Sequence, residues 1–139
     1  MAINILFSQS YFHFMKEKNE IKKTLVMGGS VKPERFANKA IIKLREYGHP
    51  VVSVGLKEGK VSDVDIQTGT PDFKDIHTIT LYLGPRNQPQ YYSYILSLKP
   101  KRIIFNPGTE NTELFELAVK NNILPVEFCT LILLDTNTF

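Results

Sequence analysis

The 139-residue sequence has a single cysteine, Cys129, so it can form no internal disulfide and has no cysteine cluster for zinc. Such sparing use of cysteine fits a reducing compartment, and we expect a cytoplasmic protein. No stretch approaches the roughly 18 apolar residues of a membrane-spanning helix, and no block of lysine and arginine indicates nucleic-acid binding. We therefore expect neither a membrane nor a nucleic acid among its partners.

The length and the composition are those of one globular domain. A domain takes roughly 100 to 200 residues, and an apolar share of 42% with a charged share of 22% is ordinary for a soluble fold. The first residues differ, because an apolar and aromatic start leads into a charged stretch at residues 16–23. We expect residues 1–22 to be an N-terminal extension and residues 23–139 to be the domain. Two alternatives stay open for the extension: it packs on the core, or the natural chain starts at Met15.

Charge is unevenly distributed along the chain. Residues 1–60 contain eleven basic and five acidic residues, a balance of +6, whereas residues 61–139 contain six basic and nine acidic ones, a balance of −3. The excess in the first part favours an anionic ligand, and solvated helix faces are the alternative explanation.

Strand and helix patterns alternate from residue 24 onward. Short apolar runs predict strands at residues 24–27, 51–54, 78–83 and 102–105, with further extended pieces at 125–128 and 131–134. Helical spacing predicts helices at 35–47 and 88–98 and a third one capped by Asn111, and residues 57–69 suggest a small hairpin. This order predicts a single-domain, Rossmann-like α/β fold with a mainly parallel sheet and helices on both faces.

The loop after the first predicted strand has the features of a phosphate-binding turn. It contains Gly28, Gly29 and Ser30, followed by Pro33 and Arg35. Glycines let the backbone approach an anion, and the amides of the next helix then point at it. We expect Gly29 to adopt a positive φ, so that a side chain there hinders the ligand more than the fold. The third glycine of the dinucleotide fingerprint is missing, and a glycine turn that binds nothing is the alternative.

The loop after the second strand indicates which nucleotides the protein could bind. NAD-binding proteins place an acid about 20 residues beyond their glycines, but the stretch from Ser53 to Lys57, which includes the candidate site residue Val54, contains none. A cation at Lys57 suits an adenosine with an additional ribose phosphate, as in coenzyme A (CoA) or NADP. A solvated lysine is the alternative.

Two further loops combine rigid turns with polar side chains. Gly84 and Pro85 follow the third strand, and the loop after the fourth contains the candidate site residues Asn106, Pro107, Gly108 and Asn111. These amides either donate to a ligand or satisfy the turn and the next helix.

No residue pattern points to catalysis or to a metal. His13, His49 and His77 lack the spacing of metal ligands, and the apolar neighbours of Cys129 predict a buried side chain. No Ser/His/Asp or paired-carboxylate arrangement stands out.

A family resemblance rests on several of these runs together. The runs are 24–30 (TLVMGGS), 33–36, 44–55, 80–85, 99–111 and 129–131. Over residues 23–139 the chain resembles the small stand-alone CoA-binding proteins of bacteria, which are similar to the nucleotide-binding domain of the succinyl-CoA synthetase alpha subunit. The resemblance implies a Rossmann-like fold and CoA or acyl-CoA as ligand. One departure concerns Gly55, because the broader family often has Val-Asn-Pro where this chain has Val54-Gly55-Leu56.

We therefore expect a protein that binds CoA or acyl-CoA at the carboxyl edge of the sheet, without catalysis of its own. One alternative is an NADP-dependent oxidoreductase, for which Tyr82 and His77 are weak proton-donor candidates. Another is a regulatory subunit with a degenerate nucleotide site and a tyrosine-rich contact surface at residues 90–94. A homodimer or a different protein partner stays open.

Overall fold

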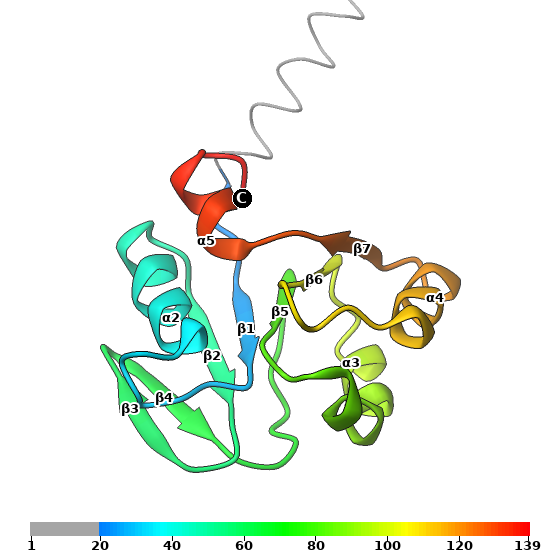
Figure 1. The fold of residues 1–139 in the computed structure, drawn as a ribbon, viewed down its shortest axis with the longest axis horizontal. Helices are drawn as coiled ribbons and strands as arrows, with labels where there is room; N and C mark the ends of the chain where they lie inside the picture. The colour runs from blue at the N-terminus through cyan, green and yellow to red at the C-terminus, as the bar shows by residue number, and fades with distance from the viewer. Residues whose placement is uncertain (1–19) are drawn as a thin grey trace, which may run out of the picture.

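The structure, a computed structural model, describes residues 20–139 and contains one seven-stranded sheet (Figure 1). The strand order is β3-β4-β2-β1-β5-β6-β7. All neighbouring strands pair in parallel except β3, which is antiparallel to β4. The strands are β1 (Thr24–Met27), β2 (Val51–Val54), β3 (Gly59–Val61), β4 (Val64–Gln67), β5 (Thr78–Leu81), β6 (Arg102–Phe105) and β7 (Leu124–Glu127).

Helices cover both faces of this sheet. They are α2 (Phe36–Glu46), α3 (Tyr92–Ser97), α4 (Thr112–Lys120) and α5 (Thr130–Asp135). Successive residues of β1 point to opposite faces: Leu25 and Met27 pack with residues of α3 and α4, whereas Val26 packs with residues of α2 and α5. The predicted Rossmann-like α/β class is therefore confirmed.

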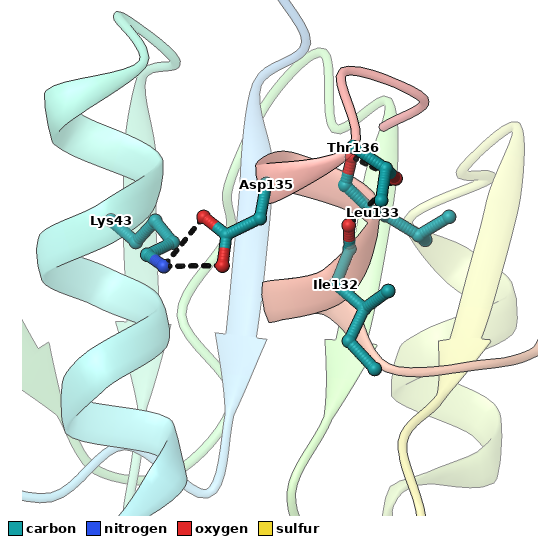
Figure 2. Close-up of polar contacts among 5 residues, drawn as sticks. All are labelled: Lys43, Ile132, Leu133, Asp135 and Thr136. Carbon is teal, nitrogen blue, oxygen red and sulfur yellow. Dashed lines mark hydrogen bonds and ion pairs between the residues drawn. The ribbon is translucent and has the colours of Figure 1, made fainter.

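Helix α5 lies beside helix α2 and is bonded to it. Lys43 Nζ of α2 lies 2.7 and 2.8 Å from the two carboxylate oxygens of Asp135 at the end of α5 (Figure 2). Thr136 Oγ1 donates to the Ile132 carbonyl at 2.7 Å and closes the last turn. Sequence reasoning predicted an extended segment at 131–134, and this was wrong. An unbroken apolar run has no period that separates a short buried helix from a strand.

The predicted helix at 88–98 was wrong in its first half. Two 3-10 turns, η1 (Pro85–Asn87) and η2 (Pro89–Tyr91), come before α3. The Tyr91 amide donates to the Gln88 carbonyl three residues back, and the fully buried Gln88 side chain donates to two loop carbonyls, which hold this segment in a tighter turn than an α-helix. The predicted strand at 78–83 is shorter and ends at Leu81, whereas the hairpin at 57–69 is confirmed as β3 and β4.

The start of the described chain is firmly attached to the sheet. Lys22 is 5% exposed, its amide donates to His49 Nδ1 at 2.9 Å, and its ammonium donates to the Phe139 carbonyl oxygen at 3.0 Å. The expectations for residues 1–19, including His13 and a start at Met15, lie outside the described residues. Within residues 20–139, no helix has the length and apolar character needed to cross a membrane.

A candidate ligand-binding cleft at the carboxyl edge of the sheet

A cleft of about 550 Å³ runs along the carboxyl edge of the sheet. It is formed by the loops after β1, β2, β5 and β6 and by the first residues of α2. Its lining residues are Gly28, Gly29, Ser30, Val31, Lys32, Arg35, Phe36, Ala37, Leu56, Lys57, Tyr82, Leu83, Gly84, Asn87, Pro107, Gly108 and Thr109. Carboxyl ends of parallel strands are where ligands bind in such folds.

The cleft brings together most of the candidate residues from all four loops. Those that line it are Gly28, Gly29, Ser30, Arg35, Lys57, Gly84, Pro107 and Gly108. The candidates Pro33, Val54, Pro85, Asn106 and Asn111 lie in or beside the same loops and are not among its lining residues. A role of any of these residues in binding stays a prediction.

The turn at Gly28 and Gly29 differs from the prediction in its backbone conformation and in its hydrogen bonds. Gly28, not Gly29, has the positive φ, at 97°. The amides of Gly28 and Gly29 both donate to the Val54 carbonyl, at 2.8 and 3.0 Å. These amides therefore hold the end of β1 to the end of β2 and are not free for an anion.

Gly29 is required by packing between strands. A Cβ at Gly29 would collide with the Ser53 hydroxyl, and a Cβ at Gly55 would collide with the Gly29 carbonyl. Ser53 is itself buried, and its hydroxyl donates to the Val26 carbonyl at 2.9 Å. The expectation that a side chain at Gly29 spares the fold was therefore wrong, because its partner lies on the neighbouring strand.

The start of α2 supplies the free amides. Arg35 caps the helix without a side-chain hydrogen bond, and the first backbone hydrogen bond of the helix runs from the Lys39 amide to the Arg35 carbonyl at 3.2 Å. Among the described residues, the amides of Phe36 and Ala37 have no protein partner, and both residues line the cleft. Unpaired amides and the positive end of the helix dipole make this place attractive to an anion.

Cations on α2 and its flanking loops fall into two groups. Lys32, Arg35 and Lys57 line the cleft, are exposed, and form no ion pair within the described part of the chain. In the second half of α2, by contrast, Lys43 pairs with Asp135 and Arg45 with Asp63, each at 2.7 Å. Among the described residues, three cations without an ion pair therefore gather where the helix meets the cleft, and Lys39, which is also unpaired, lies outside the cleft with its Nζ over the Phe36 ring.

Asn106 is buried beside the cleft and holds its loops in place through hydrogen bonds. It is 2% exposed, its amide nitrogen donates to Thr80 Oγ1 and the Leu81 carbonyl, and its oxygen accepts from the Thr130 amide. These bonds tie the ends of β5 and β6 to the start of α5, so its polar atoms are already used by the protein.

The polar atoms of Asn111 are also used in hydrogen bonds to other residues of the protein. Its oxygen accepts from the Glu113 amide and caps α4, and its nitrogen donates to Gln88 Oε1 and the Tyr92 hydroxyl, both at 2.8 Å. The Gln88 amide nitrogen in turn donates to the Leu83 and Thr109 carbonyls. Sequence reasoning missed Gln88, and its place between two prolines was the one local signal of a special turn.

The candidate proton donors are poorly placed for chemistry in the cleft. His77 precedes the first residue of β5, at the opposite edge of the sheet, and burial, followed by the nearby Arg102 and Lys22, lowers its pKa to about 4. Tyr82 does line the cleft, but its hydroxyl is buried and has no partner among the described residues. Burial raises the pKa of Tyr82, which keeps the phenol protonated at neutral pH.

Neither Cys129 nor a metal cluster adds chemistry to the cleft. Cys129 was expected to be buried but is partly exposed, at the cap of α5, and does not line the cleft. Among residues 20–139, no group of three or more histidine, cysteine, aspartate or glutamate side chains could hold a metal ion.

Comparisons with known proteins agree with this fold. A solved structure described as that of an uncharacterized protein is 47% identical to this chain, with a TM-score of 0.84, and the match covers 86% of this chain and 99% of that one. A hypothetical protein from Pyrococcus horikoshii OT3 is 24% identical, with a TM-score of 0.80 over 91% of each chain. A Thermus thermophilus protein is 19% identical, with a TM-score of 0.78. The latter two, at these identities, show the fold alone.

No curated protein matches the chain. The model of the CoA binding domain, however, matches residues 22–135, which include every strand and helix of the described part of the chain and every lining residue of the cleft. The chain belongs to the CoA binding domain family.

Proposed function

We propose that the cleft binds coenzyme A, free or as a thioester, and that binding is not coupled to catalysis by this chain. The observation that carries the proposal is the start of α2, where amides and cations that have no partner within residues 20–139 line the same cleft. CoA carries a diphosphate and a ribose phosphate, so it supplies the anionic groups that such a site lacks.

The proposed roles follow from the positions of the cations. Lys32 and Arg35 flank the free amides of α2, so they suit the diphosphate. Lys57 lies on the loop after β2, across the glycine turn, and suits the ribose phosphate. The exposed side chains of Val31 and Leu56 also border this end of the cleft and offer an apolar surface to a purine.

The lining residues support binding more than catalysis. They include no histidine, cysteine, aspartate or glutamate, and their one phenol, Tyr82, has its hydroxyl buried. An NADP-dependent oxidoreductase would need a proton donor facing the nicotinamide. Because NADP also has a ribose phosphate, it belongs in the test as a competitor.

The test is thermal unfolding of the full chain with CoA, dephospho-CoA, NADP and NAD, followed by calorimetric titration. We expect CoA to give the largest stabilisation, which is about 2.7 kcal/mol at 100 times its Kd. Dephospho-CoA, without the ribose phosphate, should bind more weakly.

A matched pair of variants localises the effect. Lys57→Gln should reduce the advantage of CoA over dephospho-CoA, whereas Lys120→Gln, at the exposed end of α4 and outside the cleft, should leave it unchanged. Stabilisation by NADP but not by CoA would favour the oxidoreductase, and no stabilisation by either would favour a degenerate regulatory site.

A further inference from the structure

The two ends of the cleft differ in charge. Its four loops follow the strand order β2, β1, β5, β6, so they lie in sequence along the sheet edge. At about 4.8 Å between neighbouring strands, the β2 and β6 ends are about 14 Å apart. The charged lining residues, Lys57, Lys32 and Arg35, all come from the β2 and β1 loops and the approach to α2.

The β5 and β6 loops form an uncharged end. Leu83 and Pro107 give it apolar walls, and the hydroxyl of the buried Thr109 donates to the Asn106 carbonyl at 2.8 Å. Of the two other polar side chains that line this end, Tyr82 has its hydroxyl buried, and the exposed Asn87 has a side-chain amide that makes no hydrogen bond within the described residues.

Glu110 adds a negative charge to this uncharged end. Glu110 is not itself a lining residue, but its carboxylate accepts a hydrogen bond from the amide of the lining Gly108 at 2.6 Å, so this backbone donor is not available to an anion. Glu110 is exposed and has no ion-pair partner among the described residues. An anion at this end would lie near the carboxylate that is bonded to Gly108 and would meet no lining cation.

Resting on the proposed CoA binding, we propose that this end of the cleft holds the thiol or acyl part of the ligand and favours uncharged acyl groups over those that end in a carboxylate. The phosphates of CoA belong at the cationic end, which directs the uncharged pantetheine arm toward the β5 and β6 loops. A succinyl or malonyl carboxylate would lose water there without gaining a cation, and it would be repelled by Glu110.

Arg86 is the cation nearest in sequence to this end. It is exposed on the turn Pro85–Asn87, but it is not among the lining residues, and within residues 20–139 it forms no ion pair. The experiment includes it because a long side chain there is the one group that could reverse the preference.

The experiment compares CoA, butyryl-CoA and succinyl-CoA by calorimetric titration of the full chain. Butyryl and succinyl differ by replacement of a methyl group with a carboxylate, so the ratio of their affinities isolates the charge. We expect succinyl-CoA to bind about tenfold more weakly than butyryl-CoA, a difference of about 1.4 kcal/mol, and the ratio to fall as salt is added.

Two variants test the assignment to this end of the cleft. Glu110→Gln keeps an acceptor for the Gly108 amide and removes the charge, so it should reduce the ratio of butyryl-CoA to succinyl-CoA affinity severalfold. Asn87→Lys should reduce this ratio further or reverse the preference. Glu116→Gln, on the exposed surface of α4, is the control and should leave the ratio unchanged.

The outcomes separate this inference from the proposed function. If CoA itself does not bind, the proposed function fails. If CoA binds and succinyl-CoA binds as well as butyryl-CoA or better, the inference is overturned, and loss of that preference in Arg86→Gln would identify Arg86 as the reader of the carboxylate. A gap unchanged by both Glu110→Gln and Asn87→Lys would overturn the placement of the acyl group.

Discussion

The two edges of the parallel sheet use the same kinds of residue in opposite ways. At the carboxyl edge, Lys32, Arg35 and Lys57 are exposed beside a cleft and have no counter-charge among the described residues. At the amino edge, Lys22 and Arg102 precede or begin strands and pack against protein groups. The first arrangement leaves charge available to a ligand, and the second uses it to fasten the fold.

The contacts at the amino edge show how the charges are accommodated. Arg102 Nε donates to Thr78 Oγ1 at 2.8 Å, and its Cζ lies 4.3 Å from the centre of the Phe139 ring. The His49 ring lies 4.9 Å from the same ring. Burial lowers the pKa of Arg102 to about 10, which still leaves the guanidinium charged at neutral pH. We call Lys22, His49, His77, Arg102 and Phe139 the amino-edge cluster.

The largest expected effect is a loss of stability caused by a substitution at the carboxyl edge, where the comparison places ligand binding. Gly29→Val should lower the free energy of unfolding by more than about 3 kcal/mol, because its side chain would collide with buried Ser53 on β2. Urea unfolding followed by circular dichroism measures the loss. As a control, Ser53→Ala should restore part of the stability of Gly29→Ala. A Gly29→Val protein as stable as the wild type, but unable to bind CoA, would return this glycine to the binding site.

Phe139→Ala, at the amino edge, should lower the stability of the fold without changing the affinity for CoA. The ring is 5% exposed and packs on His49 and Arg102, so its removal should cost about 3 kcal/mol. Because the amino-edge cluster lies across the sheet from the cleft, the affinity for CoA at a temperature well below unfolding should not change. Calorimetric titration of the same sample decides, and a weakened affinity with unchanged stability would contradict the comparison.

Acid should act on the amino edge through its two histidines. Burial, followed by the positive charges of Lys22 and Arg102, lowers the pKa of His49 to about 4, and burial with the same two cations leading lowers that of His77 to about 4. In the unfolded chain both titrate near 6.5. The unfolded state therefore binds more protons below pH 6.5, and stability should fall between pH 6.5 and 4 by on the order of 2 kcal/mol for each imidazole.

The measurement is the urea midpoint at pH 7.5 and at pH 4.5. Gln can accept the hydrogen bond that His49 receives from the Lys22 amide, so the double variant His49→Gln/His77→Gln is a suitable control. Its midpoint should change much less between the two pH values. Equal midpoints for the wild type at both would show that the imidazoles are not held neutral by the fold.

Sequence reasoning predicted the parts of this comparison that depend on neighbours in the chain. The apolar runs of β1, β2 and β6 and the helical spacing of α2 sufficed for the fold, and the glycine, lysine and arginine positions beside them pointed to the cleft. The errors arose where contacts join distant residues. The constraint on Gly29 comes from Ser53, and the turn around Gln88 depends on carbonyls at Leu83 and Thr109.

The amino-edge cluster could not be predicted for the same reason. Lys22, His49, His77 and Arg102 are widely spaced in the sequence and meet only because four parallel strands start side by side. At each of these positions the neighbouring sequence predicts only a solvated residue near the start of a strand. Its burial is a consequence of the register of the sheet and of the packing of Phe139.

The smallest expected effect on stability sharpens the comparison within one helix. Arg35→Gln removes a cation that lines the cleft, precedes α2 and has no ion pair among the described residues. Its unfolding free energy should therefore change by less than about 0.5 kcal/mol, as for an ordinary surface substitution. Its affinity for CoA should fall about tenfold, because a charge-assisted contact to a phosphate would be lost.

Arg45→Gln, in the same helix but paired with Asp63 and bonded to the His49 carbonyl, is the matched control and should lose some stability with no change in affinity. Unfolding and calorimetric titration of both variants measure the two quantities side by side. If the two substitutions weaken CoA binding equally, the net charge of the helix attracts the ligand, and the unpaired position of Arg35 carries no special role.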